Sequence, residues 1–181
     1  MKTAVNNKTK NLVLMSLFAA IISACAWLTI PATVPFTMQT FGVFLALGVL
    51  GGKRGTISVC IYLLLGIIGI PVFSAGKSGI GVLLGSTGGY LIALIFSGLV
   101  VWGMEVLLGK KTWVLALSMV LGLLVCYAIG TFWFITVYTS TSGEIGLWSA
   151  LSMCVFPFII PDLIKIALAL VLQKRLAPLV K

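Results

Sequence analysis

The chain has 181 residues, of which 61% are hydrophobic and only 8% are charged, and its net charge is +9. A soluble domain carries about 25% charged residues because its surface faces water, so this composition excludes an ordinary soluble protein and predicts a lipid-facing surface. The cations are scattered along the chain rather than gathered on one basic face, which argues against nucleic-acid binding.

Four long stretches of the chain contain no charged residue, namely 11–52, 55–76, 78–104 and 112–143. A membrane-spanning helix needs roughly 20 apolar residues, and the first stretch is long enough for two helices. We therefore predict a single all-α integral membrane domain over residues 1–181 with six transmembrane helices. The approximate helices are 11–30, 37–50, 56–69, 86–108, 112–138 and 147–173.

The first apolar segment follows a basic N-terminus, as in a secretory signal peptide. Because apolar segments continue to the C-terminus, we interpret it as a retained helix of a multi-pass protein of the cytoplasmic membrane. Two pairs of small residues are spaced four apart in it, Ala19 with Ser23 and Ala20 with Ala24. This spacing lets another helix approach closely, either a neighbour in the same bundle or a partner protein.

Residues 69–89 are rich in glycine yet still apolar. Non-helical backbone near a membrane is tolerated only where protein or an aqueous cavity covers it, so this segment is expected to cover a pocket. Gly76-Lys77-Ser78 does not complete a phosphate-binding loop, because Pro71 stands where that motif requires a glycine. We interpret Lys77 as a solvated loop charge that could attract an anion at the pocket mouth.

The positions of lysine and arginine indicate the orientation in the membrane. Apart from Lys77 and Lys165, these residues lie near the N-terminus, at 53–54, at 110–111 and near the C-terminus. Cytoplasmic loops are enriched in lysine and arginine. Both termini are therefore predicted to be cytoplasmic, and the glycine-rich loop is predicted to be extracellular.

Asp162 and Lys165 are ionisable residues inside a predicted span. They lie three apart and share one helix face, and a charge at bilayer depth costs on the order of 3 kcal/mol. A substrate or ion path is the functional interpretation, and a mutually neutralising structural pair is the alternative. Gln39 lies in an apolar run, and its buried amide needs a partner, which is either a ligand or another helix.

Catalytic groups are scarce in this sequence. With three acidic residues and no histidine, the chain offers no nucleophile–base pair, so we do not expect an enzyme. The four cysteines are isolated in apolar runs without the spacing of a metal site. We therefore expect neither a metal nor a cofactor.

Five motifs give the chain a resemblance to a known family. They are Val34–Phe41, Leu50–Gly55, Tyr62–Gly66 with Gly69–Phe73, Gly85–Tyr90 and Pro161–Lys165, in this order along nearly the whole chain. In these motifs the chain resembles the BioY family, the biotin-binding S components of energy-coupling factor (ECF) transporters. The resemblance implies capture of biotin from outside, and an energy-coupling module of one membrane scaffold subunit and two ATPases. It also implies that the alanine pairs of the first helix contact the scaffold.

Biotin has a carboxylate, a ureido ring and an apolar chain, and each part needs a suitable partner. Lys165 could meet the carboxylate, polar side chains could meet the ureido ring, and aromatic residues could form the walls. The candidate binding residues are Asp162, Lys165, Gln39, Tyr90, Ser86, Phe41, Phe73 and Lys77. Because Asp162 and Lys165 are less than one helical turn apart, we do not expect them to hold opposite ends of the ligand. An S component for another vitamin and a solitary facilitator or channel are the alternatives.

Overall fold

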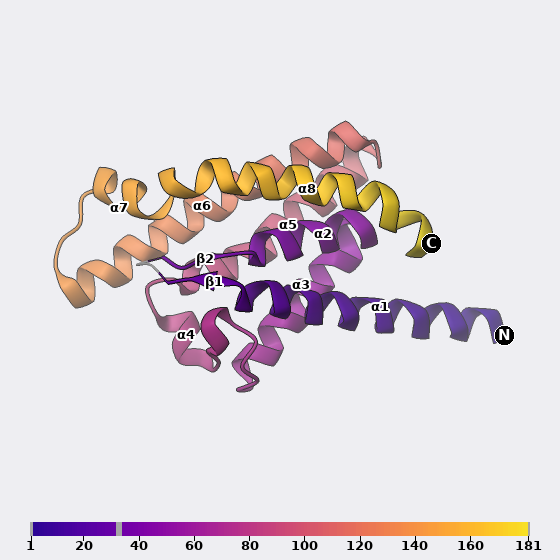
Figure 1. Ribbon diagram of the computed structural model, residues 1–181, viewed down its shortest axis with the longest axis horizontal. Coiled ribbons are helices and arrows are strands. Elements are labelled where there is room, and N and C mark those ends of the chain that lie inside the picture. Colours follow the sequence, from indigo (N-terminus) through magenta and orange to yellow (C-terminus); the bar gives the residue numbers. More distant parts are fainter. Residues whose placement is uncertain (1, 32–33, 181) are drawn as a thin grey trace.

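The computed structural model describes the backbone of residues 2–31 and 34–180, and within these ranges the side chains from residue 7 onward. The chain is mostly helical, with one short pair of strands between the first two helices (Figure 1). The elements are α1 (Lys2–Trp27), β1 (Thr29–Ile30), β2 (Phe36–Thr37), α2 (Gln39–Leu50), α3 (Gly52–Ile67), η1 (Ser74–Gly76), α4 (Ile80–Leu84), α5 (Gly88–Leu108), α6 (Thr112–Ser142), α7 (Leu147–Cys154) and α8 (Phe156–Val180).

Four segments are long and apolar enough to cross a membrane: Asn7–Trp27, Gly88–Leu108, Thr112–Ser142 and Leu147–Val180. The shorter apolar helix Gln39–Leu50 lies among them. The chain is thus a mostly helical membrane protein with four long apolar segments and several shorter helices.

The connection from α1 to α2 differs from the predicted pair of adjoining helices. β1 and β2 pair in antiparallel register, with Thr29 opposite Thr37 and Ile30 opposite Phe36. Prolines such as Pro35 lack the backbone donor that a helix needs. The chain therefore leaves α1 as a short hairpin, and α2 begins only at Gln39.

The last predicted span, 147–173, consists of two helices. α7 ends at Cys154, and Val155 (φ −126°, ψ −58°) leaves the helical conformation before α8 begins at Phe156. Pro157 lies in the first turn of α8, where the missing N–H of proline is not needed. Pro161 lies further inside α8.

The helices pack through close approaches of their backbones. α1 packs against α2 and α3, α2 packs against α8, and α5 packs against α6. At the α2–α3 contact, a Cβ atom on Gly55 would lie 2.6 Å from the Cα of Leu47. Lipid gives apolar helices no reason to associate, so such close packing of small residues is what holds a membrane bundle together.

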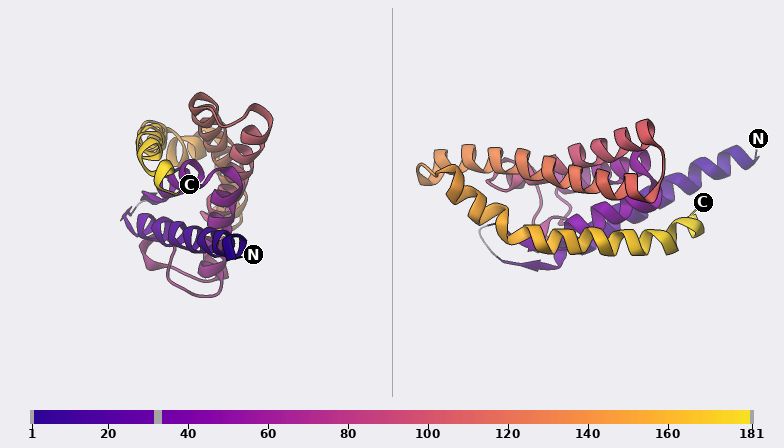
Figure 2. Two further views of the ribbon diagram at one scale, coloured as in Figure 1. Left: turned by 90° about the vertical axis from the view of Figure 1, so that its right-hand side faces the viewer. Right: turned by 90° about the horizontal axis from the view of Figure 1, so that it is seen from above.

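Both chain ends lie at one end of the elongated bundle, together with the α5–α6 turn, and the α6–α7 connection lies at the opposite end (Figures 1 and 2). Near the chain ends, Arg54 donates a hydrogen bond to Asn11 Oδ1 (2.9 Å). Glu105 forms an ion pair with Lys110 (2.9 Å) and accepts a hydrogen bond from the Gly52 N–H at the start of α3. Glu105 thus accepts a hydrogen bond from a backbone N–H in the first turn of α3 that has no partner within the helix.

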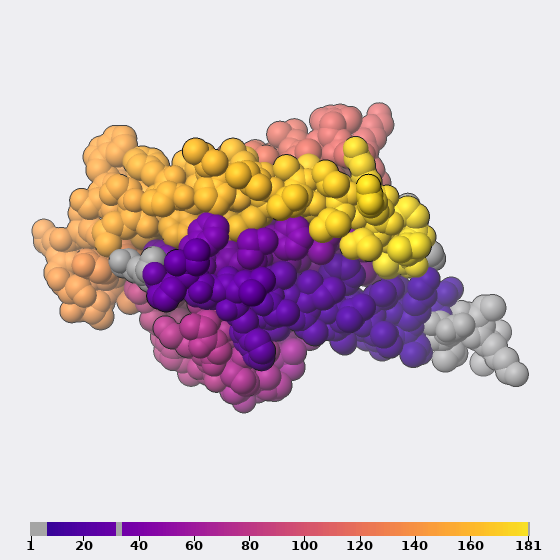
Figure 3. All heavy atoms as spheres, viewed as in Figure 1, coloured from indigo at the N-terminus to yellow at the C-terminus, as the bar shows by residue number. Residues whose placement is uncertain are grey.

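Figure 3 shows α8 lying above α1 and α2 on one face, with the segment that includes α4 projecting below them. Buried apolar residues from α1, α2, α3, α5, α6 and α8 form the main core. A second, smaller core joins Val34 to Phe134 of α6 and to Ala150 and Cys154 of α7. Cys126 and Cys154 are buried, whereas Cys25 and Cys60 are partly buried, and all four are free.

Candidate functional site

A cavity of about 480 Å³ lies among α2, α5, α6 and α8, beside the segment that carries η1 and α4. It is lined by Val34, Pro35, Thr37, Gln39, Thr40, Phe73, Ser74, Lys77, Ser78, Gly81, Val82, Gly85, Ser86, Thr87, Tyr90, Leu91, Leu94, Leu123, Cys126, Tyr127, Cys154, Phe158, Asp162 and Lys165. Apolar and aromatic side chains form most of the wall, and a small group of polar side chains converges on one part of it. Ligand pockets for small molecules commonly have this composition.

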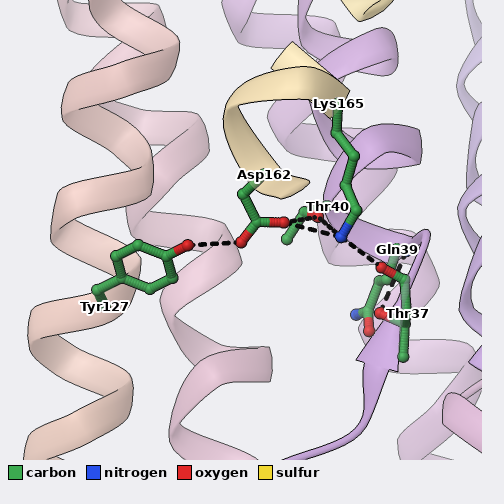
Figure 4. Close-up of polar contacts among 6 residues, drawn as sticks. All are labelled: Thr37, Gln39, Thr40, Tyr127, Asp162 and Lys165. Atoms are coloured by element: carbon green, nitrogen blue, oxygen red, sulfur yellow. Dashed lines mark hydrogen bonds and ion pairs between the residues drawn. The ribbon is translucent and has the colours of Figure 1, made fainter. Parts of the chain in front are cut away.

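The convergent polar group centres on an ion pair inside α8 (Figure 4). Lys165 Nζ lies 2.8 Å from Asp162 Oδ1, and the two residues are only 4% and 3% exposed. Thr40 of α2 donates to the same carboxylate oxygen (3.0 Å), and Tyr127 of α6 donates to Asp162 Oδ2 (2.7 Å). Three helices therefore meet at the Asp162 carboxylate.

The Lys165 ammonium uses all three of its donors within the chain. Besides Asp162, it donates to the Thr37 carbonyl oxygen (2.7 Å) and to Thr40 Oγ1 (3.2 Å). It also lies 4.2 Å from the centre of the Phe36 ring, where the face of the ring attracts a cation. The network carries no net charge and leaves Lys165 no spare donor, which keeps two buried charges tolerable at membrane depth.

Gln39 lies beside this network with its side-chain amide buried and without a protein partner. The side chain is 7% exposed, and Nε2 makes no hydrogen bond within the described chain. Only its backbone N–H is used locally, donating to Thr37 Oγ1 (3.2 Å). A buried donor without an acceptor destabilises a protein by about 1–3 kcal/mol, so an acceptor in the cavity would remove that penalty.

Four more predicted binding residues line the same cavity: Phe73, Lys77, Ser86 and Tyr90. Phe73 packs edge-on against Tyr62, with ring centroids 5.6 Å apart. The Tyr90 hydroxyl lies 2.9 Å from Thr131 Oγ1. Lys77 is exposed, and its ammonium makes no hydrogen bond or ion pair with any described residue.

Three predicted site residues lie elsewhere. Phe41 is partly buried, packs against the main core and is not among the described residues that line the cavity. Ala19 and Ser23 are buried within the chain, and Ser23 bonds to the Ala19 carbonyl oxygen (2.9 Å). These two therefore face the bundle and cannot meet a partner protein in this conformation, whereas Ala20 and Ala24 face outward.

Sequence reasoning missed Thr37, Thr40 and Tyr127, which hold the ion pair in place. The threonines flank Gln39 in the same motif, so their position beside a predicted site residue was a usable signal. Tyr127 is one of several hydroxyl-bearing residues in a long, mostly apolar helix. A polar group in such a helix needs a partner, and only the fold identifies Asp162 as that partner.

The whole sequence matches a known family: the family model of the BioY family covers residues 1–181. A "Biotin transporter BioY" of Thermotoga maritima is 40% identical over 171 residues, which is 94% of this chain and 97% of the relative. A "Probable biotin transporter BioY" of Pyrococcus horikoshii is 39% identical over 170 residues, which is 93% of this chain and 97% of the relative. The solved S-component for biotin from an ECF-type ABC transporter superposes with a TM-score of 0.82 at 32% identity, covering 94% of this chain and 92% of that one. The chain belongs to the BioY family.

Proposed function

We propose that this chain is the biotin-binding S component of an ECF-type ABC transporter and that it binds biotin in the cavity described above. The family, the names of its relatives and the solved neighbour support this substrate. The observation that carries the proposal is the unpartnered amide of Gln39 beside a neutralised ion pair in a cavity of about 480 Å³. This combination provides polar specificity without a net charge at membrane depth.

The cavity suits a small bicyclic urea with a carboxylate tail. Its volume lies within the range of about 300–1,000 Å³ that is usual for small-molecule sites. Gln39 Nε2 can donate to the ureido carbonyl, and the Asp162 carboxylate, which has lone pairs to spare, can accept from a ureido N–H. Phe73, Tyr90 and Phe158 provide walls for the sulfur-containing ring and the aliphatic chain.

The biotin carboxylate is then directed away from Lys165. Its three donors already have partners, and drawing the ammonium away from Asp162 would leave a buried carboxylate uncompensated. Lys77 lines the same cavity from an exposed position and has no ion pair among the described residues. We therefore assign the ureido ring to the Gln39–Asp162 region and the carboxylate to Lys77.

Six membrane spans with both termini in the cytoplasm follow as part of the proposal. α2 is about 18 Å long at 1.5 Å per residue, so together with the β1–β2 hairpin it would make one crossing. α1, α3, α5, α6 and the α7–α8 pair would make the other five. The basic residues near the chain ends and at the α5–α6 turn lie at one end of the bundle, which supports a cytoplasmic location for that end.

The partners would be a membrane scaffold subunit and two ATPases. The sequence lacks a phosphate-binding loop, so the energy for uptake would come from the ATPases. Ala20 and Ala24 face outward on α1, and their four-residue spacing would let a scaffold helix approach closely. Reorientation of the chain against the scaffold would then release biotin into the cytoplasm.

Isothermal titration of the detergent-purified protein with biotin tests the proposal, with thiamine and riboflavin as controls. One-to-one binding of biotin, with no heat from the other two vitamins, is the expected result. Heat from another vitamin, with none from biotin, would retain an S component but refute the substrate. Absence of heat with all three, for a protein shown to be folded, would refute the function.

A further inference from the structure

The turn between α4 and α5 carries hydroxyl groups to the cavity, yet little within the turn itself holds it in place. Ser86 and Thr87 line the cavity, and neither hydroxyl has a hydrogen-bond partner among the described residues. The backbone of the turn closes through Gly88 N–H to the Gly85 carbonyl (3.0 Å), and no side chain caps the start of α5. The two free hydroxyls are therefore available to a ligand, provided that the turn keeps its position.

Residues of α6 hold this turn from outside the cavity. The Trp133 indole N–H donates to the Gly85 carbonyl oxygen (3.0 Å). Trp133 also packs against Gly89, where even a Cβ atom would overlap the Trp133 side chain. The indole thus contacts the first residue of the turn through a hydrogen bond and the start of α5, just after the turn, through a close packing contact.

A second contact from the same face of α6 supports the start of α5. Gly130 lies three residues before Trp133, so both face α5, and the Tyr90 ring occupies the space beside Gly130. The Tyr90 hydroxyl lies 2.9 Å from Thr131 Oγ1. Tyr90 itself lines the cavity, whereas Trp133 is absent from the described residues that do so.

We infer that Trp133 is a positioning residue for the proposed biotin site: it fixes the Gly85–Thr87 turn so that the Ser86 and Thr87 hydroxyls reach the ligand. This inference rests on the proposed function. Trp133 acts on the ligand only through the turn, because its one hydrogen bond goes to the turn's backbone. Its loss is therefore expected to reduce affinity without removing any group that touches the ligand.

Trp133→Phe removes the indole N–H and keeps an aromatic ring at the packing contact. The loss of this one hydrogen bond is expected to lower biotin affinity about three- to tenfold, which corresponds to about 0.7–1.4 kcal/mol. Trp113→Phe is the matched control, since Trp113 lies exposed at the other end of α6 and should leave affinity unchanged. Trp133→His keeps a ring N–H, so it is expected to bind biotin more tightly than Trp133→Phe.

A double-mutant cycle separates positioning from general support of the fold. In a Ser86→Ala, Thr87→Val background, which lacks the two hydroxyls, Trp133→Phe is expected to change biotin affinity less than about twofold. Wild-type affinity in Trp133→Phe would overturn the inference, and so would a loss of equal size in both backgrounds. Tighter binding by the Phe variant than by the His variant would assign Trp133 a space-filling role and overturn it as well. A wild-type protein that binds no biotin would overturn the proposed function first, and the positioning role with it.

Discussion

Replacing Asp162 by asparagine removes one charge from the buried ion pair and leaves the other in place. In Asp162→Asn the Lys165 ammonium keeps its bonds to the Thr37 carbonyl (2.7 Å) and Thr40 Oγ1 (3.2 Å) but loses the carboxylate at 2.8 Å. Lys165 is only 4% exposed, and the asparagine amide oxygen carries no charge to compensate its ammonium. Breaking a buried pair by removing one member costs about 3–5 kcal/mol.

The double variant Asp162→Asn, Lys165→Met separates this electrostatic penalty from ligand recognition. It removes both charges at nearly constant volume, and such replacements of a buried pair are often neutral or stabilising. The melting temperature of the ligand-free protein should therefore fall in Asp162→Asn and recover in the double variant. Biotin affinity should be at least about tenfold weaker in both, because both lack the carboxylate that is proposed to accept from the ureido ring.

Thermal melting and biotin titration of the same detergent-purified samples measure the two effects. Recovery of both stability and affinity in the double variant would show that the pair is structural alone. Wild-type melting in Asp162→Asn would refute the claim that the carboxylate compensates a buried ammonium.

Three further predictions follow from the same geometry. Gln39→Leu removes a buried amide without a partner, so the melting temperature of the ligand-free protein should rise while biotin affinity falls about tenfold. A lower melting temperature would show that the Gln39 amide does have a hydrogen-bond partner in the ligand-free protein. Lys77→Ala should weaken binding of biotin but not of biotin amide, which lacks the carboxylate, and the control Lys111→Ala should change neither; equal losses for both ligands would exclude Lys77 as the counter-ion. Ala20→Leu with Ala24→Leu should preserve biotin affinity and abolish co-purification with the scaffold subunit, whereas intact co-purification would place the scaffold contact elsewhere.

The sequence predicted those parts of the fold that depend on composition and on breaks in the apolar runs. α5 and α6 lie close to the predicted 86–108 and 112–138. The boundary between them was easy to locate, because a glycine and two lysines at 109–111 separate two apolar runs. The β1–β2 hairpin was missed, since strands of two residues leave no periodic pattern. The bend at Val155 divides the span predicted as 147–173, and its position depends on the packing of α7 against α8.

The direction of individual side chains was less accessible from the sequence. In a soluble helix the polar face identifies the buried face by contrast, but in a membrane both faces are apolar. Phe41 was therefore expected at the cavity although it packs into the core, and Ala19 was grouped with the outward-facing Ala20. Charged residues are easier to orient, because exposing a charge to lipid costs free energy and the charge must therefore face the protein. The pairing of Asp162 with Lys165 was accordingly predicted from their spacing.

The charges around the cavity also bear on which vitamins it can accept. Asp162 is the only acidic side chain among the described residues that line it, and it is already compensated by Lys165. The other cation at the cavity, Lys77, has no partner in the described chain. A permanently cationic ligand such as thiamine would therefore meet an unpaired positive charge and find no free carboxylate to balance its own. An anionic ligand with a neutral, hydrogen-bonding head can instead pair its negative charge with Lys77. Its neutral head can bond to Asp162 without needing a free carboxylate to balance a charge. Charge alone thus favours biotin over thiamine in this cavity, before any difference in shape is considered.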